Sequence, residues 1–124
     1  IENVGLRTKN NVLFDLPEYV ALLDIFPQAG ALLDTGHAHV NGWDIPAVVK
    51  ALGERLAACH VHDNDGNGDA HLPVGQGDID WKAYFGAVKK YAPQATQVFE
   101  YCCGFNNTKD LEAHIAELKA KYKL

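Results

Sequence analysis

Residues 57–64 read Ala57-Ala58-Cys59-His60-Val61-His62-Asp63-Asn64. The run is short, mainly apolar until its last residues, and followed by glycine-rich sequence, as is typical of a buried strand that ends at a loop. Because side chains alternate along a strand, His60 and His62 share one face, whereas Cys59 and Val61 share the other. We therefore predict a strand that packs one face into a core and carries two imidazoles on the other.

The same pattern of an apolar run followed by a helix signal recurs along the chain. The other predicted strands are Ile1–Val4, Ala31–Asp34 and Gln97–Tyr101. The predicted helices begin at the capping pair Asp15 and Glu18, at Asp44, at Asp80 and at Thr108. Short strands that alternate with helices predict an α/β fold with a parallel sheet and helices outside it. We expect a single domain over residues 1–124, built of four βα units, which is half of a (β/α)8 TIM barrel.

Half of a barrel leaves an incomplete surface. Four parallel strands in an open sheet would have two unpaired edges and one uncovered face. The chain also contains no methionine and opens directly on an apolar run. We therefore expect either a fragment that lacks its N-terminal half-barrel or a homo-oligomer that pairs its own edges.

Each predicted strand carries a polar residue near its carboxyl end. These residues are Glu2, Asp34, His60 and Glu100. Taken singly, each has an ordinary structural interpretation, as a cap, a loop residue or a satisfied core histidine. Strand alternation, however, allows all four to point inward at the same height at the mouth of the sheet, where barrel enzymes place their functional groups. Crowded carboxylates repel one another unless a cation neutralises them, and this oxygen-rich set with one imidazole suits one Mn²⁺, Mg²⁺, Co²⁺ or Zn²⁺ ion.

Further polar residues surround this set. His37 follows the second strand closely, and Asp69 and His71 lie in the long loop 63–77. Such a loop is either a functional element or a flexible surface connection, and the sequence leaves both open. His62 lies one pleat beyond His60, roughly 6–7 Å along the strand, so we predict that it supports the site without being a ligand.

Composition excludes several classes of protein. The net charge of −5 argues against a nucleic-acid partner. No stretch approaches the ~18 apolar residues of a membrane span, so no membrane is expected. The three cysteines, Cys59, Cys102 and Cys103, form no disulfide framework or metal-binding spacing, which favours a reduced, cytoplasmic protein.

Taken together, the motifs resemble those of a known superfamily. In order they are Glu2-Asn3, Asp34-Thr35-Gly36-His37, His60-Val61-His62-Asp63-Asn64, Gly75-Gln76-Gly77-Asp78-Ile79-Asp80-Trp81 and Glu100. This ordered set resembles the C-terminal half of the xylose-isomerase-like TIM-barrel superfamily, which includes sugar isomerases, ketose epimerases and apurinic endonucleases. The resemblance covers the whole chain but does not select one reaction.

The branches of the superfamily imply different sites. The epimerase branch implies a single metal held by Glu2, Asp34, His60 and Glu100, with the two glutamates as the acid/base pair and His37 near the substrate oxygens. One departure counts against close kinship, since the arginine that some epimerases carry six residues after the metal histidine is Gly66 here. The endonuclease branch implies additional Zn²⁺ ions, held with the help of the equivalents of His37, Asp69 and His71.

The expectation is a divalent-metal-dependent isomerase or epimerase of a small sugar or sugar phosphate. Glu2 and Glu100 would transfer the proton α to the carbonyl through an enediolate. Two alternatives stay open: a multi-zinc, endonuclease-like phosphodiesterase that uses Asp69 and His71, and a non-catalytic half-barrel.

Overall fold

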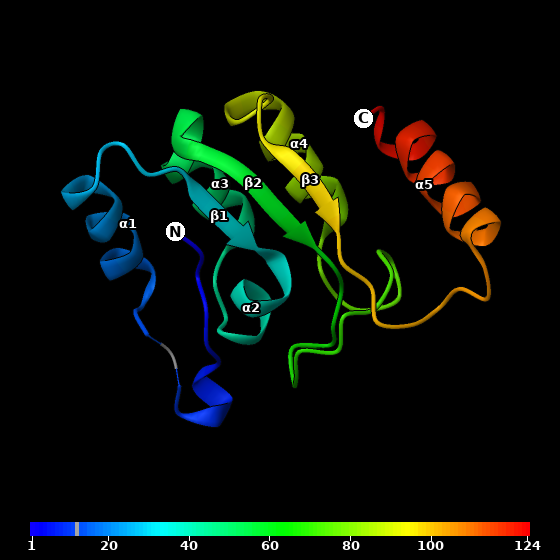
Figure 1. Ribbon diagram of the computed structural model, residues 1–124, viewed down its shortest axis with the longest axis horizontal. Coiled ribbons are helices and arrows are strands. Elements are labelled where there is room, and N and C mark those ends of the chain that lie inside the picture. The colour runs from blue at the N-terminus through cyan, green and yellow to red at the C-terminus, as the bar shows by residue number, and fades with distance from the viewer. Residues whose placement is uncertain (12) are drawn as a thin grey trace.

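A parallel β-sheet runs through the middle of the molecule in the computed structural model, which describes residues 1–11 and 13–124 (Figure 1). In this described part the sheet has three strands in the order β1-β2-β3, which are β1 (Ala31–Asp34), β2 (Leu56–Val61) and β3 (Thr96–Phe99). Both pairings are parallel, and they place Asp34 opposite His60 and His60 opposite Val98. The polar residues predicted at the strand ends are therefore brought to one edge of the sheet.

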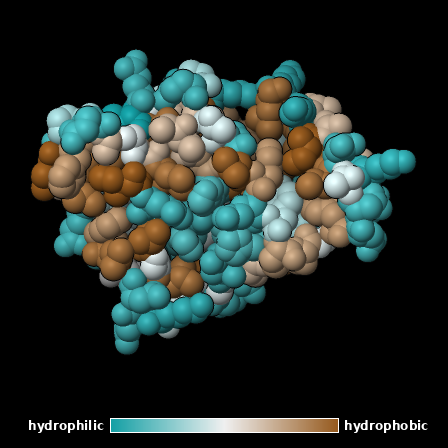
Figure 2. All heavy atoms as spheres, in the orientation of Figure 1, coloured by the Kyte–Doolittle hydropathy of each residue, from teal (hydrophilic) through white to brown (hydrophobic). Residues whose placement is uncertain are grey.

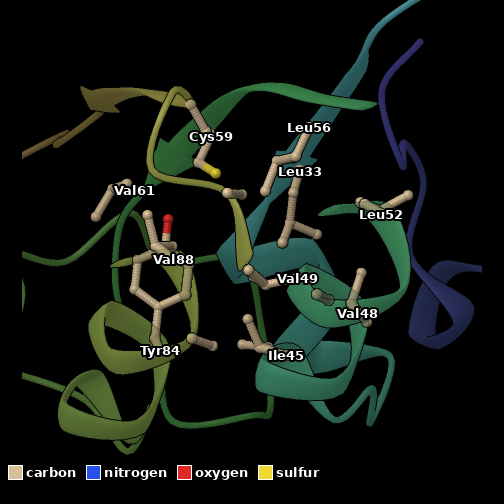
Figure 3. Packing of buried hydrophobic residues seen from close by; sticks show 14 of the residues in the cluster. Leu33, Ile45, Val48, Val49, Leu52, Leu56, Cys59, Val61, Tyr84 and Val88 are labelled. Atoms are coloured by element: carbon tan, nitrogen blue, oxygen red, sulfur yellow. The ribbon is translucent and has the colours of Figure 1, made fainter. Parts of the chain in front are cut away.

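Two helices cover one face of this sheet. They are α3 (Ile45–Leu52) and α4 (Trp81–Tyr91), which lie behind the strands in Figure 1. Leu33, Cys59 and Val61 are fully buried between the sheet and these helices, as Figure 3 shows. The other two long helices, α1 (Leu16–Ile25) and α5 (Thr108–Tyr122), flank the sheet beside β1 and β3. This arrangement confirms the predicted α/β half-barrel class.

The helix-start signals act largely as predicted. The Glu18 carboxylate accepts a 2.9 Å bond from the backbone N–H of Asp15 at the start of α1. Asp44 and Asp80 each accept a bond from the backbone N–H three residues further on, at 3.1 and 2.9 Å. Side-chain oxygens thus satisfy N–H groups that the first helical turn leaves unpaired.

The start of α5 differs from the prediction by one residue. Asn107, not Thr108, is the cap, because its side-chain oxygen accepts bonds from the N–H groups of Lys109 and Asp110 at 2.9 and 3.1 Å. Asn107 also has the extended backbone that a cap requires, whereas Thr108 is already the first helical residue.

The predicted strand Ile1–Val4 is wrong, so the four expected strands become three within the described residues. Only a single parallel bridge, Glu2 with Leu32, joins this segment to the sheet. After that bridge the chain turns away, because Val4 N–H bonds back to the Glu2 carbonyl at 3.1 Å. The side chain of Asn3 bonds to the backbone of Asp34, where a longer strand would have formed backbone-to-backbone bonds.

A short helix that the sequence analysis missed follows β1 directly. This is α2 (Thr35–Val40), and Asp34 caps it by accepting a 2.8 Å bond from the N–H of His37. Asp34 therefore both ends the strand and begins the helix. This turn of helix directs His37 back towards the strand ends.

The long loop after β2 is organised around one buried carboxylate. Asp63 Oδ2 accepts bonds from the backbone of Gly75 and the indole of Trp81, at 2.9 and 2.7 Å. Its Oδ1 accepts from the backbone of Asn64 and Ile79, at 3.0 and 3.2 Å. An antiparallel bridge between Asp63 and Leu72 adds two backbone bonds. These bonds tie the segment that leaves β2 to Leu72, Gly75 and Ile79, whereas a function for the loop stays a prediction.

The second face of the sheet is far less covered than the first. Leu32 and Ala58 are half-buried, and Val98 is 43% exposed. Figure 2, in the orientation of Figure 1, shows hydrophilic atoms near the middle of this face, between apolar areas on either side. Within residues 1–11 and 13–124, no helix combines the length and the apolar character that crossing a membrane requires.

Candidate metal centre

Three carboxylates surround one imidazole nitrogen at the carboxyl edge of the sheet. His60 Nδ1 lies 3.5 Å from Glu2 Oε1, 3.6 Å from Asp34 Oδ2 and 3.5 Å from Glu100 Oε2. The structure thus gathers the four residues singled out in the sequence around one point. The three carboxylates and the imidazole are the donor types that bind Mg²⁺, Mn²⁺ or Zn²⁺.

The four residues are not level along the strands, which differs from the expectation of equal height. Asp34 and His60 are direct partners. Glu2 forms its bridge two residues earlier, beside Leu32, and Glu100 lies two residues past the partner of His60. The set therefore runs diagonally across the register. Barrel strands tilt by ~35–45° from the barrel axis, so such a diagonal brings residues to one level of the barrel mouth.

The geometry also explains how Glu100 reaches the centre although it lies beyond β3. Its backbone N–H donates a 3.1 Å bond to the carbonyl of Val61, which extends the ladder by one residue. Its side chain is 46% exposed, the most accessible of the four, whereas that of Asp34 is 1% exposed. Asp34 is thus fixed in the protein, and Glu100 remains open to an approaching molecule.

Asp34 is held ionised by its surroundings. Burial by itself raises the pKa of this carboxyl, but the hydrogen bond and charge of His62, with contributions from His37, outweigh it and leave the pKa below its usual value. His62 Nε2 lies 3.1 Å from the carboxylate, and His37 N–H donates to Oδ1. A lowered pKa favours the ionised carboxylate, which is the form that binds a cation.

Asp69 forms a second polar cluster next to the first. Its carboxylate lies 3.3 Å from His37 Nε2, 3.2 Å from His71 Nε2 and 3.8 Å from His62 Nδ1. His37, Asp69 and His71 were predicted as a substrate-binding or second metal group, and the structure brings them together. The pKa of His71 is raised: burial lowers it, but the bond to the Glu100 carbonyl and the nearby carboxylates outweigh that effect.

His62 lies between the two clusters. It is fully buried, stacks on His71 with ring centroids 3.8 Å apart, and directs Nε2 to Asp34. Among the described residues, its Nδ1 and Asp69 Oδ1 are buried without a hydrogen-bond partner. Unpaired buried polar atoms are costly, so these two atoms fit a further polar or cationic group between them. Whether His62 supports the site or also ligates a metal stays a prediction.

Donor atoms suited to an ion cluster twice within the described residues. The first group is Glu2, Asp34 and His60, and the second is His62, His71 and Glu100. Within each group the donor atoms lie within 4.8 Å of one another. Glu100 belongs to the second group by this distance, yet its Oε2 is nearer to His60 than to His71, at 3.5 against 3.8 Å. Glu100 can therefore link the two positions.

Three residues that position the site were not identified from the sequence. Asn3 exchanges two bonds with the backbone of Asp34, at 2.7 and 3.1 Å. The Thr35 hydroxyl bonds to the carbonyls of His60 and His62, at 3.1 and 3.0 Å. A Cβ on Gly36 would lie 2.0 Å from the ring of His62. The signal was their adjacency to Glu2 and Asp34, but sequence alone assigns them no partner.

Comparison with known proteins identifies the family to which this fold belongs. A family model described as the xylose isomerase-like TIM barrel matches residues 1–121. The uncharacterized protein MJ1614 of Methanocaldococcus jannaschii is 36% identical over 58 residues, which are 47% of this chain and 22% of that protein. The uncharacterized protein y4fM of Sinorhizobium fredii is 37% identical over 59 residues, 48% of this chain and 19% of that protein.

A solved structure matches over nearly the whole chain. The crystal structure of a D-tagatose 3-epimerase-like protein superimposes with a TM-score of 0.67 and 25% identity, over 97% of this chain and 47% of that chain. In all three proteins the matched part is less than half of the length. Because the family model covers almost every residue, this chain belongs to the xylose isomerase-like TIM barrel family.

Proposed function

We propose that this chain is the metal-binding half of an isomerase or epimerase that transfers a proton on a small sugar or sugar phosphate. The observation that carries the proposal is the convergence of Glu2, Asp34 and Glu100 on Nδ1 of His60, all within 3.6 Å. The family and the epimerase-like solved structure support the reaction class.

The residues fit a divalent cation. Three carboxylates this close together repel one another, and a shared cation converts that repulsion into attraction. When bound, the ion supplies a Lewis acid that offsets the negative charge developing on the carbonyl and hydroxyl oxygens of the sugar. Glu2, Asp34, His60 and Glu100 would hold it, and His62 and Asn3 would keep Asp34 in place.

The two glutamates are placed for acid/base work. Glu2 approaches His60 from the segment beside β1, and Glu100 approaches it from the end of β3, so a substrate between them meets a carboxylate from each side. One glutamate removes the proton on the carbon next to the carbonyl, and the other delivers a proton to the product. His37, 18% exposed, is within reach of the same space and would contact substrate oxygens.

Two measurements on the purified chain test this proposal. Elemental analysis without chelator is expected to show one divalent ion per chain. Deuterium from D₂O is expected to enter a ketose next to its carbonyl, and Glu100→Gln is expected to slow this exchange by at least ~100-fold. Glu112→Gln, an exposed glutamate on α5, is the matched control and should change neither result. One bound ion without exchange would leave a non-catalytic half-barrel, and no ion at all would refute the proposal.

A second candidate rests on the Asp69 cluster. Asp69 lies within 3.8 Å of three imidazoles, which suits an additional Zn²⁺ and therefore a multi-zinc phosphodiesterase. The net charge of −5 weighs against a DNA substrate. Two or three zinc ions per chain, together with hydrolysis of a phosphodiester such as bis-p-nitrophenyl phosphate, would favour this candidate over the isomerase.

A further inference from the structure

A pair of adjacent thiols lies outside the metal centre. Cys102 and Cys103 are both free and exposed, in the segment that joins β3 to α5. Both line a cavity of about 490 Å³ between that segment and α5. The proposed proton transfer uses neither the thiols nor the cavity.

The walls of this cavity are largely apolar and aromatic. Besides the two thiols, its lining includes Phe99, Tyr101, Phe105, Leu111 and Ile115. Tyr101 and Phe105 lie 5.7 Å apart between ring centroids, so an aromatic wall stands directly beside the cysteines. A flat apolar group entering the cavity would bury its surface against these rings.

Two neighbouring cysteines are better suited to chelation than to forming a disulfide with each other. Adjacent Cα atoms are ~3.8 Å apart, shorter than the ~4.4–6.8 Å of ordinary disulfides, so a direct S–S bond would be strained. An atom inserted between the sulfurs enlarges the ring and removes this strain.

We propose that Cys102, Cys103 and the adjoining cavity form a binding site for thiophilic compounds that carry an apolar group. Aryl compounds of trivalent arsenic belong to this class. With phenylarsine oxide, both thiols replace the oxygen on arsenic: two As–S bonds form, the As–O bond breaks, and the oxygen leaves as water with the two thiol protons. Arsenic stays trivalent, so no oxidant or reductant is needed. The phenyl ring occupies the cavity.

This site is physically connected to the metal centre. The Cys102 backbone N–H donates a 3.1 Å bond to the His71 carbonyl, and its thiol donates to the Ala70 carbonyl at 3.2 Å. The ring of His71 in turn bonds to the Glu100 carbonyl at 3.1 Å. Capture of Cys102 removes its bond to Ala70 and therefore displaces His71.

Intact-protein mass spectrometry with phenylarsine oxide tests the proposal. One phenylarsenic adduct per chain is expected, resistant to excess 2-mercaptoethanol but reversed by 1,2-ethanedithiol. Cys102→Ser and Cys103→Ser should each abolish this resistance, and peptide mapping should leave the buried Cys59 unmodified. An adduct that survives equally in either single variant, or no resistant adduct in the unsubstituted chain, would overturn the proposal.

Two further measurements test whether the cavity contributes to binding and whether capture by the thiols affects His71. Leu111→Ala should weaken capture of phenylarsine oxide by ~5-fold without changing capture of arsenite, which has no apolar group. The imidazole NMR signals of His71 should shift on capture, and those of His39 on α2 should not. Equal effects on both arsenicals would remove the cavity from the site, and an unshifted His71 would refute the connection to the metal centre.

Discussion

His62 Nε2 lies 3.1 Å from the carboxylate of Asp34, and both side chains are almost completely withdrawn from solvent. His60, two residues earlier and within β2, instead directs Nδ1 into the gap between the carboxylates. Two histidines only two positions apart therefore have different partners. This difference underlies the first prediction.

Metal affinity should depend far more on His60 than on His62. His60→Ala removes the only imidazole of the predicted ligand set and should lower Mn²⁺ affinity by more than ~100-fold, whereas His62→Asn should cost at most about tenfold, as outer-shell changes usually do. Isothermal titration calorimetry of the two variants measures both values. Equal losses would show that His62 is itself a ligand.

Two helical glycines should respond oppositely to the same substitution. In Gly36→Ala the new Cβ would lie 2.0 Å from the His62 ring, so we expect a loss of ~2–3 kcal/mol in unfolding free energy. In Gly86→Ala, on α4, the new Cβ would meet no described atom within 4 Å apart from its chain neighbours and the backbone of its own helix, and higher helix propensity should stabilise the chain by ~0.5–1 kcal/mol. Urea denaturation measures the unfolding free energy of both variants. Destabilisation of similar size in both would mean that the contact with His62 does not cause the loss in Gly36→Ala.

The loop that carries Asp69 and His71 should depend on Asp63. Asp63→Asn replaces a carboxylate that accepts four bonds with an amide whose NH₂ group faces donors, and ~3 kcal/mol of unfolding free energy should be lost. The control is Asp78→Asn in the same loop, whose exposed carboxylate makes no hydrogen bond within the described part of the chain. Chemical denaturation with a chelator present measures both, and a change below ~1 kcal/mol in Asp63→Asn would contradict the expectation.

Two histidines should give opposite pH dependences of stability. The pKa of His114 is lowered, mainly by burial, so its folded form resists protonation and stability falls as pH decreases through the unfolded value of 6.5. The pKa of His71 is raised, so its contribution is complete below 6.5 and is lost as pH rises through the folded value.

Urea titrations from pH 5 to 8 in chelator measure these contributions. Relative to the unsubstituted chain, His114→Gln should gain stability towards pH 5, and His71→Gln should lose it there. The same sign in both variants would show that one of the two environments is wrongly assigned.

The open face of the sheet should promote association. Leu32 and Val98 lie on this face, Val98 is 43% exposed, and the edge of β3 has no strand beyond it in the described part of the chain. We predict that the chain is not a monomer, and that Val98→Lys shifts it towards one. Sedimentation velocity at micromolar concentration gives the answer, since a folded species of 13.6 kDa before any substitution would contradict the prediction.

Local rules were sufficient for much of the fold and for the membership of the site. Alternation along residues 57–62 separated the core residues Cys59 and Val61 from the site residue His60 without reference to other strands. Aspartates before helical patterns marked the starts of α1, α3 and α4, because the side chain or its capping partner bonds to the first turn. These features depend on residues within a few positions of one another, which a sequence displays directly.

The tertiary structure decided what depends on distant partners. Glu2 reaches the centre through one bridge and not through a strand, because Asn3 bonds to Asp34, 31 residues away. Asp69 contacts His37, 32 positions earlier, because the bonds of Asp63 fold the loop back over the strand ends. The diagonal register, likewise, follows from the pairing of whole strands. The sequence by itself determined which donor groups this protein has, but only the packing of remote segments determined which atoms of those groups face one another.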